Sequence, residues 1–118
     1  MRNLPEPLTI QTVGPFTVIA AGTPGAPDAF VARIEPSAAD PVAMLRAAFG
    51  RDYQGCTPDP VPLFDAQAGL VYLGGTVRHG GTTIWIGQAF DPGQIPDRLV
   101  ATEVVAAIVK RHFAPSRA

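Results

Sequence analysis

The sequence predicts an α+β fold: a single domain over residues 1–118 with the element order β-β-β-α-β-β-α. We expect a twisted antiparallel sheet of about five strands, with both helices on one face. Two observations predict this class. Short runs of β-forming residues are separated by glycine and proline turns, and helix signals follow the third and the last of these runs. Runs of antiparallel strands, with helices only between the hairpins, favour an α+β fold over a parallel doubly wound sheet.

The first three strands are predicted as a hairpin and one further strand. Residues 8–13 alternate in polarity and residues 16–21 are rich in β-formers, with a Gly-Pro pair between them. Residues 29–35 alternate again and end at a proline. Before the hairpin, residues 1–7 contain two prolines, which suits an extended segment, so we expect a loose N-terminal arm.

The first helix is predicted from its capping residues. Asp40 is a good N-cap, because its carboxylate accepts hydrogen bonds from unpaired helical N–H groups, and Pro41 is preorganised for the first helical position. Apolar residues at i, i+3 and i+7 from position 42 form one stripe. Gly50 then ends the helix as a left-handed cap.

Residues 51–69 are predicted as a long, Pro-rich loop. Prolines at three alternate positions favour an extended, polyproline-like path, with a short edge strand at 61–64. Because structureless loops of this length are uncommon unless functional, we expect a site here.

Residues 70–90 carry the strongest hairpin signal. Gly80-Gly81 suits a two-residue primed turn, and in that register Val77 faces Ile84. Gly74 then lies opposite Gly87, in strand centres where glycine costs stability. Close helix packing or a bulge explains these glycines, and a ligand or a partner backbone lying on the bare patch is the alternative.

The last helix is predicted from about Asp97 to Phe113, and its apolar surface is wider than one sheet requires. Either its own chain covers it, or part of it meets a partner. The candidate interface residues are Val100, Val104, Val105 and Ile108.

A candidate pocket is predicted between the 51–69 loop and the 70–90 hairpin. Its wall and polar groups would be Tyr53, Cys56, His79 and Trp85. A lone cysteine is most often a small buried hydrophobe, and a nucleophilic Cys56 would need a histidine within reach. His79 is at a hairpin tip, where polar residues are more often simply solvated.

Composition restricts the function further. The net charge of −1 and the low charged fraction of 16% argue against nucleic acid and leave a sparsely charged surface. The sequence contains no recognisable metal-ligand spacing, cofactor motif or membrane span, so we expect no metal, cofactor or membrane partner. One cysteine and no apolar leader make the cytoplasm the expected compartment.

Three functional hypotheses remain. The favoured one is a non-catalytic protein-interaction module, such as an adaptor, a chaperone-like binder or an inhibitor or immunity-type protein. It would be homo-oligomeric, most naturally a homodimer formed through the last helix or a sheet edge. A small-molecule-binding protein or minor enzyme using the candidate pocket is the second hypothesis. A structural subunit of a larger assembly is the third.

Overall fold

Six strands, two helices and a terminal π-helical turn form the part of the chain that the structure describes. This computed structural model describes residues 4–23, 26–49, 57–65, 70–90, 93 and 101–113. The elements are β1 (Leu8–Val13), β2 (Phe16–Ala21), β3 (Phe30–Glu35), α1 (Pro41–Phe49), β4 (Thr57–Asp65), β5 (Leu70–His79), β6 (Thr82–Phe90), α2 (Ala101–Ile108) and η2 (Val109–Phe113). The α+β class is therefore confirmed.

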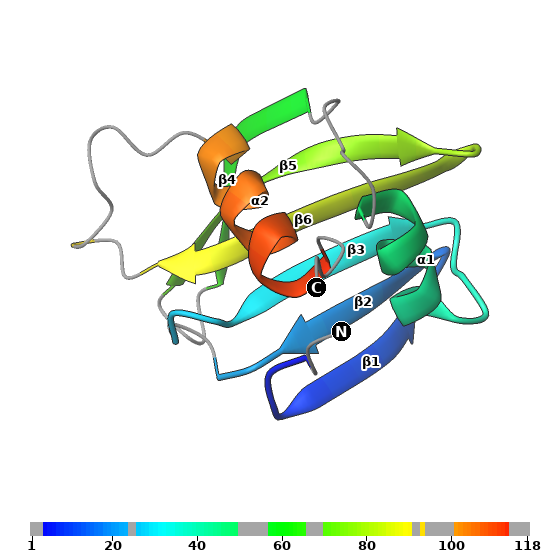
Figure 1. Cartoon of the computed structure of the whole chain (residues 1–118), viewed down its shortest axis with the longest axis horizontal. Coiled ribbons are helices and arrows are strands. Elements are labelled where there is room, and N and C mark those ends of the chain that lie inside the picture. Colours follow the sequence, from blue (N-terminus) through cyan, green and yellow to red (C-terminus); the bar gives the residue numbers. More distant parts are fainter. Residues whose placement is uncertain are drawn as a thin grey trace, which may run out of the picture.

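The strands form one antiparallel sheet in the order β1-β2-β3-β6-β5-β4. Each half of the chain is a three-strand meander followed by a helix, and the halves join through β3 and β6. The outer strands of the sheet are therefore β1 and β4. Both helices lie on the same face of the sheet, as predicted (Figure 1).

The strand β4 extends the predicted 61–64 edge strand to Thr57–Asp65, so the sheet has six strands and this part of the predicted 51–69 loop is corrected. The rest of the predicted loop lies outside the described residues. Because of the Gly80-Gly81 turn, the main-chain groups of residues 79, 77 and 75 of β5 bond to β6. Those of the residues between them, such as 76 and 74, therefore face β4. Their partners in β4 are Thr57, Asp59, Leu63 and Asp65. Pro58 and Pro62 alternate with these partners, and a register shift separates Asp59 from Leu63. Because both prolines stand at outward positions, their missing N–H groups cost the ladder no hydrogen bond.

The 70–90 hairpin forms in the predicted register, and the first hairpin forms between the two predicted strands. Gly80 and Gly81 have φ of 57° and 82°, which fits a type I′ turn, and Val77 pairs with Ile84. The first hairpin turns at Gly14, whose φ is 59°, and β1 and β2 have the predicted bounds. The register of each hairpin follows from the turn that closes it.

The core lies between the helices and one face of the sheet. On the sheet side it contains Ile19, Ala32, Ile34, Val77, Ile84 and Ile86. From the helical elements it contains Leu45, Ala48, Phe49, Val104, Val105, Ile108 and Phe113. The predicted interface through Val104, Val105 and Ile108 is thereby corrected, because these side chains are buried within their own chain. Val100, the fourth candidate, lies outside the described residues.

Two shorter segments are fixed by named contacts. Asp40 caps α1, since its Oδ1 accepts a hydrogen bond from the Ala43 N–H at 3.1 Å. The described part of the arm, residues 4–7, is held and not loose. Leu4 packs on the core, and the Gly22 N–H donates to the Pro7 carbonyl at 2.9 Å.

Candidate functional site

The most unusual surface of the described chain is the strand β1. All six of its residues are exposed, although Leu8, Ile10 and Val13 have large apolar side chains that are 42%, 46% and 46% exposed. The strand has neighbour β2 on one side and ends the sheet on the other. An exposed, apolar outer strand is a template for pairing with another chain.

The direction of the β1 main chain follows from the turn that closes its hairpin. In a two-residue turn the flanking residues, Val13 and Phe16, exchange hydrogen bonds, and bonded pairs then recur at every second position. The Gly22–Pro7 hydrogen bond falls on this pattern. Residues 7, 9, 11 and 13 therefore face β2, and the N–H and C=O groups of Leu8, Ile10 and Thr12 point outward. We call these outward groups the β1 edge.

The side chains of the edge residues lie on the helix-covered face. Ile10 pairs directly with Ile19 and Leu8 with Ala21, and both partners are core residues. Side chains of directly paired residues share a face, so Leu8 and Ile10 extend the apolar core surface beyond the last strand. No residue of β1 is charged. The edge thus lacks the charges and prolines that usually protect outer strands.

The opposite edge, on β4, is protected. Its outward positions 58 and 62 are prolines, which have no N–H to offer to a partner strand. The two halves of the fold therefore end in strands of opposite character. One has a complete outward row of donors and acceptors, and the other has an interrupted row.

The structure describes two of the four predicted pocket residues, His79 and Trp85, and does not bring them together. Trp85 pairs with Thr76, whereas His79 pairs with Thr82, so the two side chains lie on opposite faces of the sheet. His79 lies on the helix side and lines a groove of about 530 Å³ with α1 and the preceding loop. Tyr53 and Cys56 lie outside the described residues.

The groove beside His79 has little chemistry to offer. It is lined by Ala38, Ala39, Asp40, Ala43, Met44, Ala47, His79 and Gly80. Asp40 already serves as the cap of α1, which leaves His79 as the one ionisable side chain of the lining without a described role. A single imidazole above alanines does not form a catalytic constellation.

The strand-centre glycines have a packing explanation. A Cβ on Gly87 would lie 2.7 Å from Cζ2 of Trp85, so the indole ring occupies the space above this glycine. A Cβ on Gly74 would lie 2.0 Å from the Ile86 carbonyl oxygen. These approaches account for glycine at both positions by close contacts within β5 and β6. The nearest atoms belong to these strands and not to a helix, so the predicted close helix packing is not what requires the glycines.

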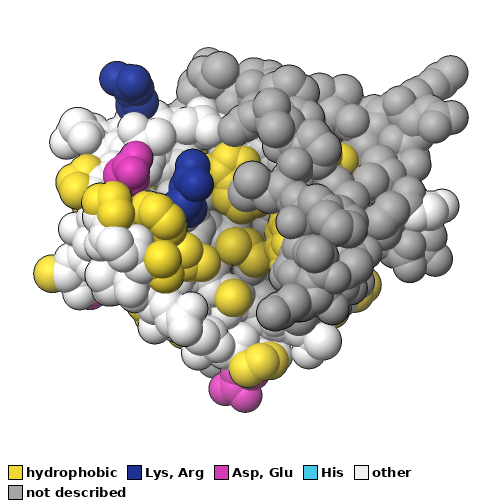
Figure 2. All heavy atoms as spheres, turned by 180° about the vertical axis from the view of Figure 1, so that it is seen from behind, with side chains coloured by type: hydrophobic (Ala, Val, Ile, Leu, Met, Phe, Trp, Pro, Cys, Tyr) yellow, Lys and Arg dark blue, Asp and Glu magenta, His cyan; other side chains and the backbone are white. Residues whose placement is uncertain are grey.

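Besides the β1 edge, the face of the sheet opposite the helices is also left uncovered by the described helices. Figure 2 shows hydrophobic side chains beside scattered charged ones on its described part. Phe16 and Val18 are half-buried there, and the Arg33 guanidinium lies 5.4 Å from the centre of the Phe16 ring. This cation–π contact covers part of the apolar surface with a charge.

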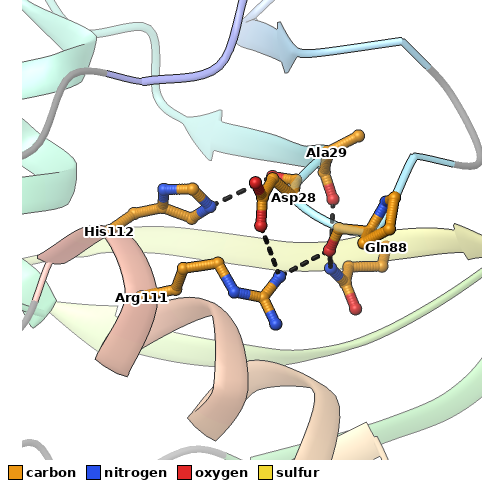
Figure 3. Close-up of polar contacts among 6 residues, drawn as sticks. Asp28, Ala29, Gln88, Arg111 and His112 are labelled. Atoms are coloured by element: carbon orange, nitrogen blue, oxygen red, sulfur yellow. Dashed lines mark hydrogen bonds and ion pairs between the residues drawn. The ribbon is translucent and has the colours of Figure 1, made fainter.

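A polar cluster ties the end of the chain to the β2–β3 connection (Figure 3). The His112 Nε2–H donates to the Asp28 carbonyl at 3.0 Å, and Arg111 contacts both the Pro27 carbonyl and, at 3.4 Å, the Asp28 carboxylate. Gln88 donates to the Pro27 and Ala29 carbonyls at 3.1 and 3.2 Å. Every contact has a main-chain carbonyl or an exposed carboxylate as acceptor, so the cluster has a structural role: it holds η2 and β6 against residues 27–29. We call this cluster the latch.

The described residues contain no group of three His, Cys, Asp or Glu side chains that could hold a metal ion. Neither described helix is long and apolar enough to cross a membrane. No protein-family model, no curated protein and no solved structure matches the chain.

Sequence reasoning did not single out the β1 edge. Its alternation is equally typical of a half-buried inner strand, and only the strand order makes it an edge. The available signal was an uncharged, proline-free strand in a chain with thirteen prolines.

Proposed function

We propose that this chain is a non-catalytic protein-interaction module that binds by accepting an added strand at the β1 edge, and that it is homo-oligomeric. The observation that carries the proposal is the outward N–H and C=O row of Leu8, Ile10 and Thr12 on a fully exposed, uncharged strand. Recognition by strand addition uses main-chain hydrogen bonds for affinity and alternate side chains for specificity.

The chemistry of the edge defines the kind of partner. An added strand must be extended and must present its own N–H groups, which excludes proline at the bonded positions. Its side chains on the helix-covered face would meet Leu8 and Ile10, so apolar or β-branched residues fit there. Because a single strand gives a small interface, below about 1,200 Å² in total, we expect reversible binding.

The experiment uses a synthetic strand as probe. A fluorescein-labelled peptide with the sequence of residues 7–13, Pro-Leu-Thr-Ile-Gln-Thr-Val, is titrated with the protein and followed by fluorescence anisotropy. A matched peptide with proline in place of its isoleucine is the control. We expect the first peptide to bind and the second to bind at least about tenfold more weakly, because it lacks the central donor.

A protein variant completes the test. Ile10→Pro removes an outward N–H and no bond to β2, so the variant should stay folded and lose peptide binding. Should Ile10→Pro unfold, Ile10→Lys replaces it, since a lysine on an edge opposes added strands. Equal peptide binding by wild type and a folded edge variant, or no binding to either, would overturn the proposal.

A further inference from the structure

We infer that the strand added at the β1 edge is β1 of a second copy of the chain, antiparallel to the first, with Ile10 on the twofold axis. This inference rests on the proposed function and names the partner of the same edge. It joins two six-stranded sheets into one continuous sheet. A twofold axis perpendicular to the sheet keeps the helices of both copies on one face.

The register follows from the alternation of the main chain. Bonded pairs between two antiparallel strands form only between residues whose N–H and C=O groups point toward each other. Centring on Ile10 pairs all three outward residues: Ile10 with its counterpart, and Leu8 with Thr12 of the second copy. A shift by two residues leaves one outward residue of each strand without such a partner.

The side chains suit this register. Ile10 meets Ile10 of the second copy on the helix-covered face, where each is 46% exposed in the single chain. Aliphatic β-branched pairs across strands are favourable, and no like charges are opposed because β1 has none. A strand that carried charges could not pair with itself at so little electrostatic cost.

The asymmetry of the two edges selects a closed dimer. Head-to-tail pairing of β1 with β4 of the next copy would produce an open filament. Pro58 and Pro62 interrupt the donor row of β4, which disfavours that arrangement. Pairing β1 with β1 uses the same complete edge twice and leaves only the interrupted β4 edges at the ends of the joined sheet.

The experiment measures the register by disulfide cross-linking in a Cys56→Ser background, with oxidised glutathione as oxidant. Bonded pairs have Cα atoms about 5.5 Å apart, within the range that a disulfide spans. We expect Ile10→Cys to give a covalent dimer of twice the 12.4 kDa chain mass. Leu8→Cys alone should not cross-link, whereas a mixture of Leu8→Cys and Thr12→Cys should.

Val13→Cys is the matched control, because Val13 is exposed to the same extent as Ile10 but would stand opposite residue 7. Cross-linking of Val13→Cys or of Leu8→Cys alone, at the rate of Ile10→Cys, would overturn the register. Light scattering on the unmodified chain should show a mass that doubles with concentration. A chain that stays monomeric and yet binds the 7–13 peptide would overturn this inference and the proposed homo-oligomer, and would leave strand addition at the β1 edge intact. Failure of the peptide to bind would refute strand addition itself.

Discussion

Ile10 and Ile19 stand directly opposite each other on β1 and β2 with their side chains on the same face of the sheet. Ile19 is fully buried, whereas 46% of the Ile10 side chain is exposed. The boundary between core and solvent therefore runs between two paired isoleucines. The apolar face of the sheet therefore extends from the buried Ile19 to the exposed Ile10, where the described residues no longer cover it.

This pair gives the first prediction. Ile19→Ala should lower the free energy of unfolding by about 2–5 kcal/mol, because it removes buried methyl groups and leaves a cavity. Ile10→Ala in dilute protein should lower it by less than about 1 kcal/mol. Urea denaturation of both variants measures the difference. Equal losses would mean that Ile10 is covered in the single chain.

The last helix gives the second prediction. Val105 is 2% exposed and belongs to the core, while its neighbour Ala106 is exposed. Val105→Glu would bury an unpaired carboxylate, so we expect loss of the cooperative folding transition. Ala106→Glu, the matched control, should fold with nearly unchanged stability. Circular dichroism during heating distinguishes the two. A folded, monomeric Val105→Glu variant would restore the helix as an interface.

Local signals in the sequence were sufficient for most of the fold. The Gly80-Gly81 turn determines the register of β5 and β6, and Asp40 with Pro41 determines where α1 begins. The β4 strand was predicted only over 61–64, shorter than Thr57–Asp65, because alternate prolines usually exclude a strand. They are compatible with this one only because Pro58 and Pro62 face away from β5, which depends on the neighbouring strand's register.

The candidate site depended on information that no local pattern holds. A wide apolar helix surface has the same sequence pattern whether a sheet, a second helix or a partner covers it. Phe113 illustrates this. Its ring lies 5.6 Å from the Phe30 ring and 6.2 Å from the Phe49 ring, and both of these residues are far from Phe113 in the sequence. Likewise the exposure of Ile10 follows from strand order, which the alternation of residues 8–13 does not determine.

The Trp85–Gly87 contact gives the third prediction. Gly87→Ala would place a methyl group 2.7 Å from the indole ring and 2.4 Å from the Leu73 carbonyl oxygen, so we expect a loss of about 1–3 kcal/mol. The control is Gly80→Asn at the exposed turn, where asparagine tolerates a φ of 57° and nothing lies within 4 Å. Thermal unfolding of both variants, with Trp85 fluorescence as probe, checks this. An unchanged Gly87→Ala protein would show that the ring is not held over the glycine.

The latch gives the fourth prediction. Asp28→Asn removes an ion pair whose carboxylate is 67% exposed, and such pairs contribute little, so the loss should stay below about 1 kcal/mol. His112→Ala removes a buried ring that packs 5.2 Å from Phe30 and donates to the Asp28 carbonyl, so we expect about 2–4 kcal/mol. Denaturant midpoints of the two variants measure the order. If Asp28→Asn lowered the free energy of unfolding more than His112→Ala, the ion pair would be the main stabilising contact of the latch.

The most direct test of the β1 edge is residue-resolved amide hydrogen exchange by NMR, in dilute protein, in concentrated protein and with the 7–13 peptide. The amides of Thr9, Gln11 and Val13 bond to β2 and should be protected in all three samples. Those of Leu8, Ile10 and Thr12 should exchange freely when the protein is dilute and slow in the other two samples. If none of these three amides slows in either sample, the β1 edge accepts no strand and the account is contradicted.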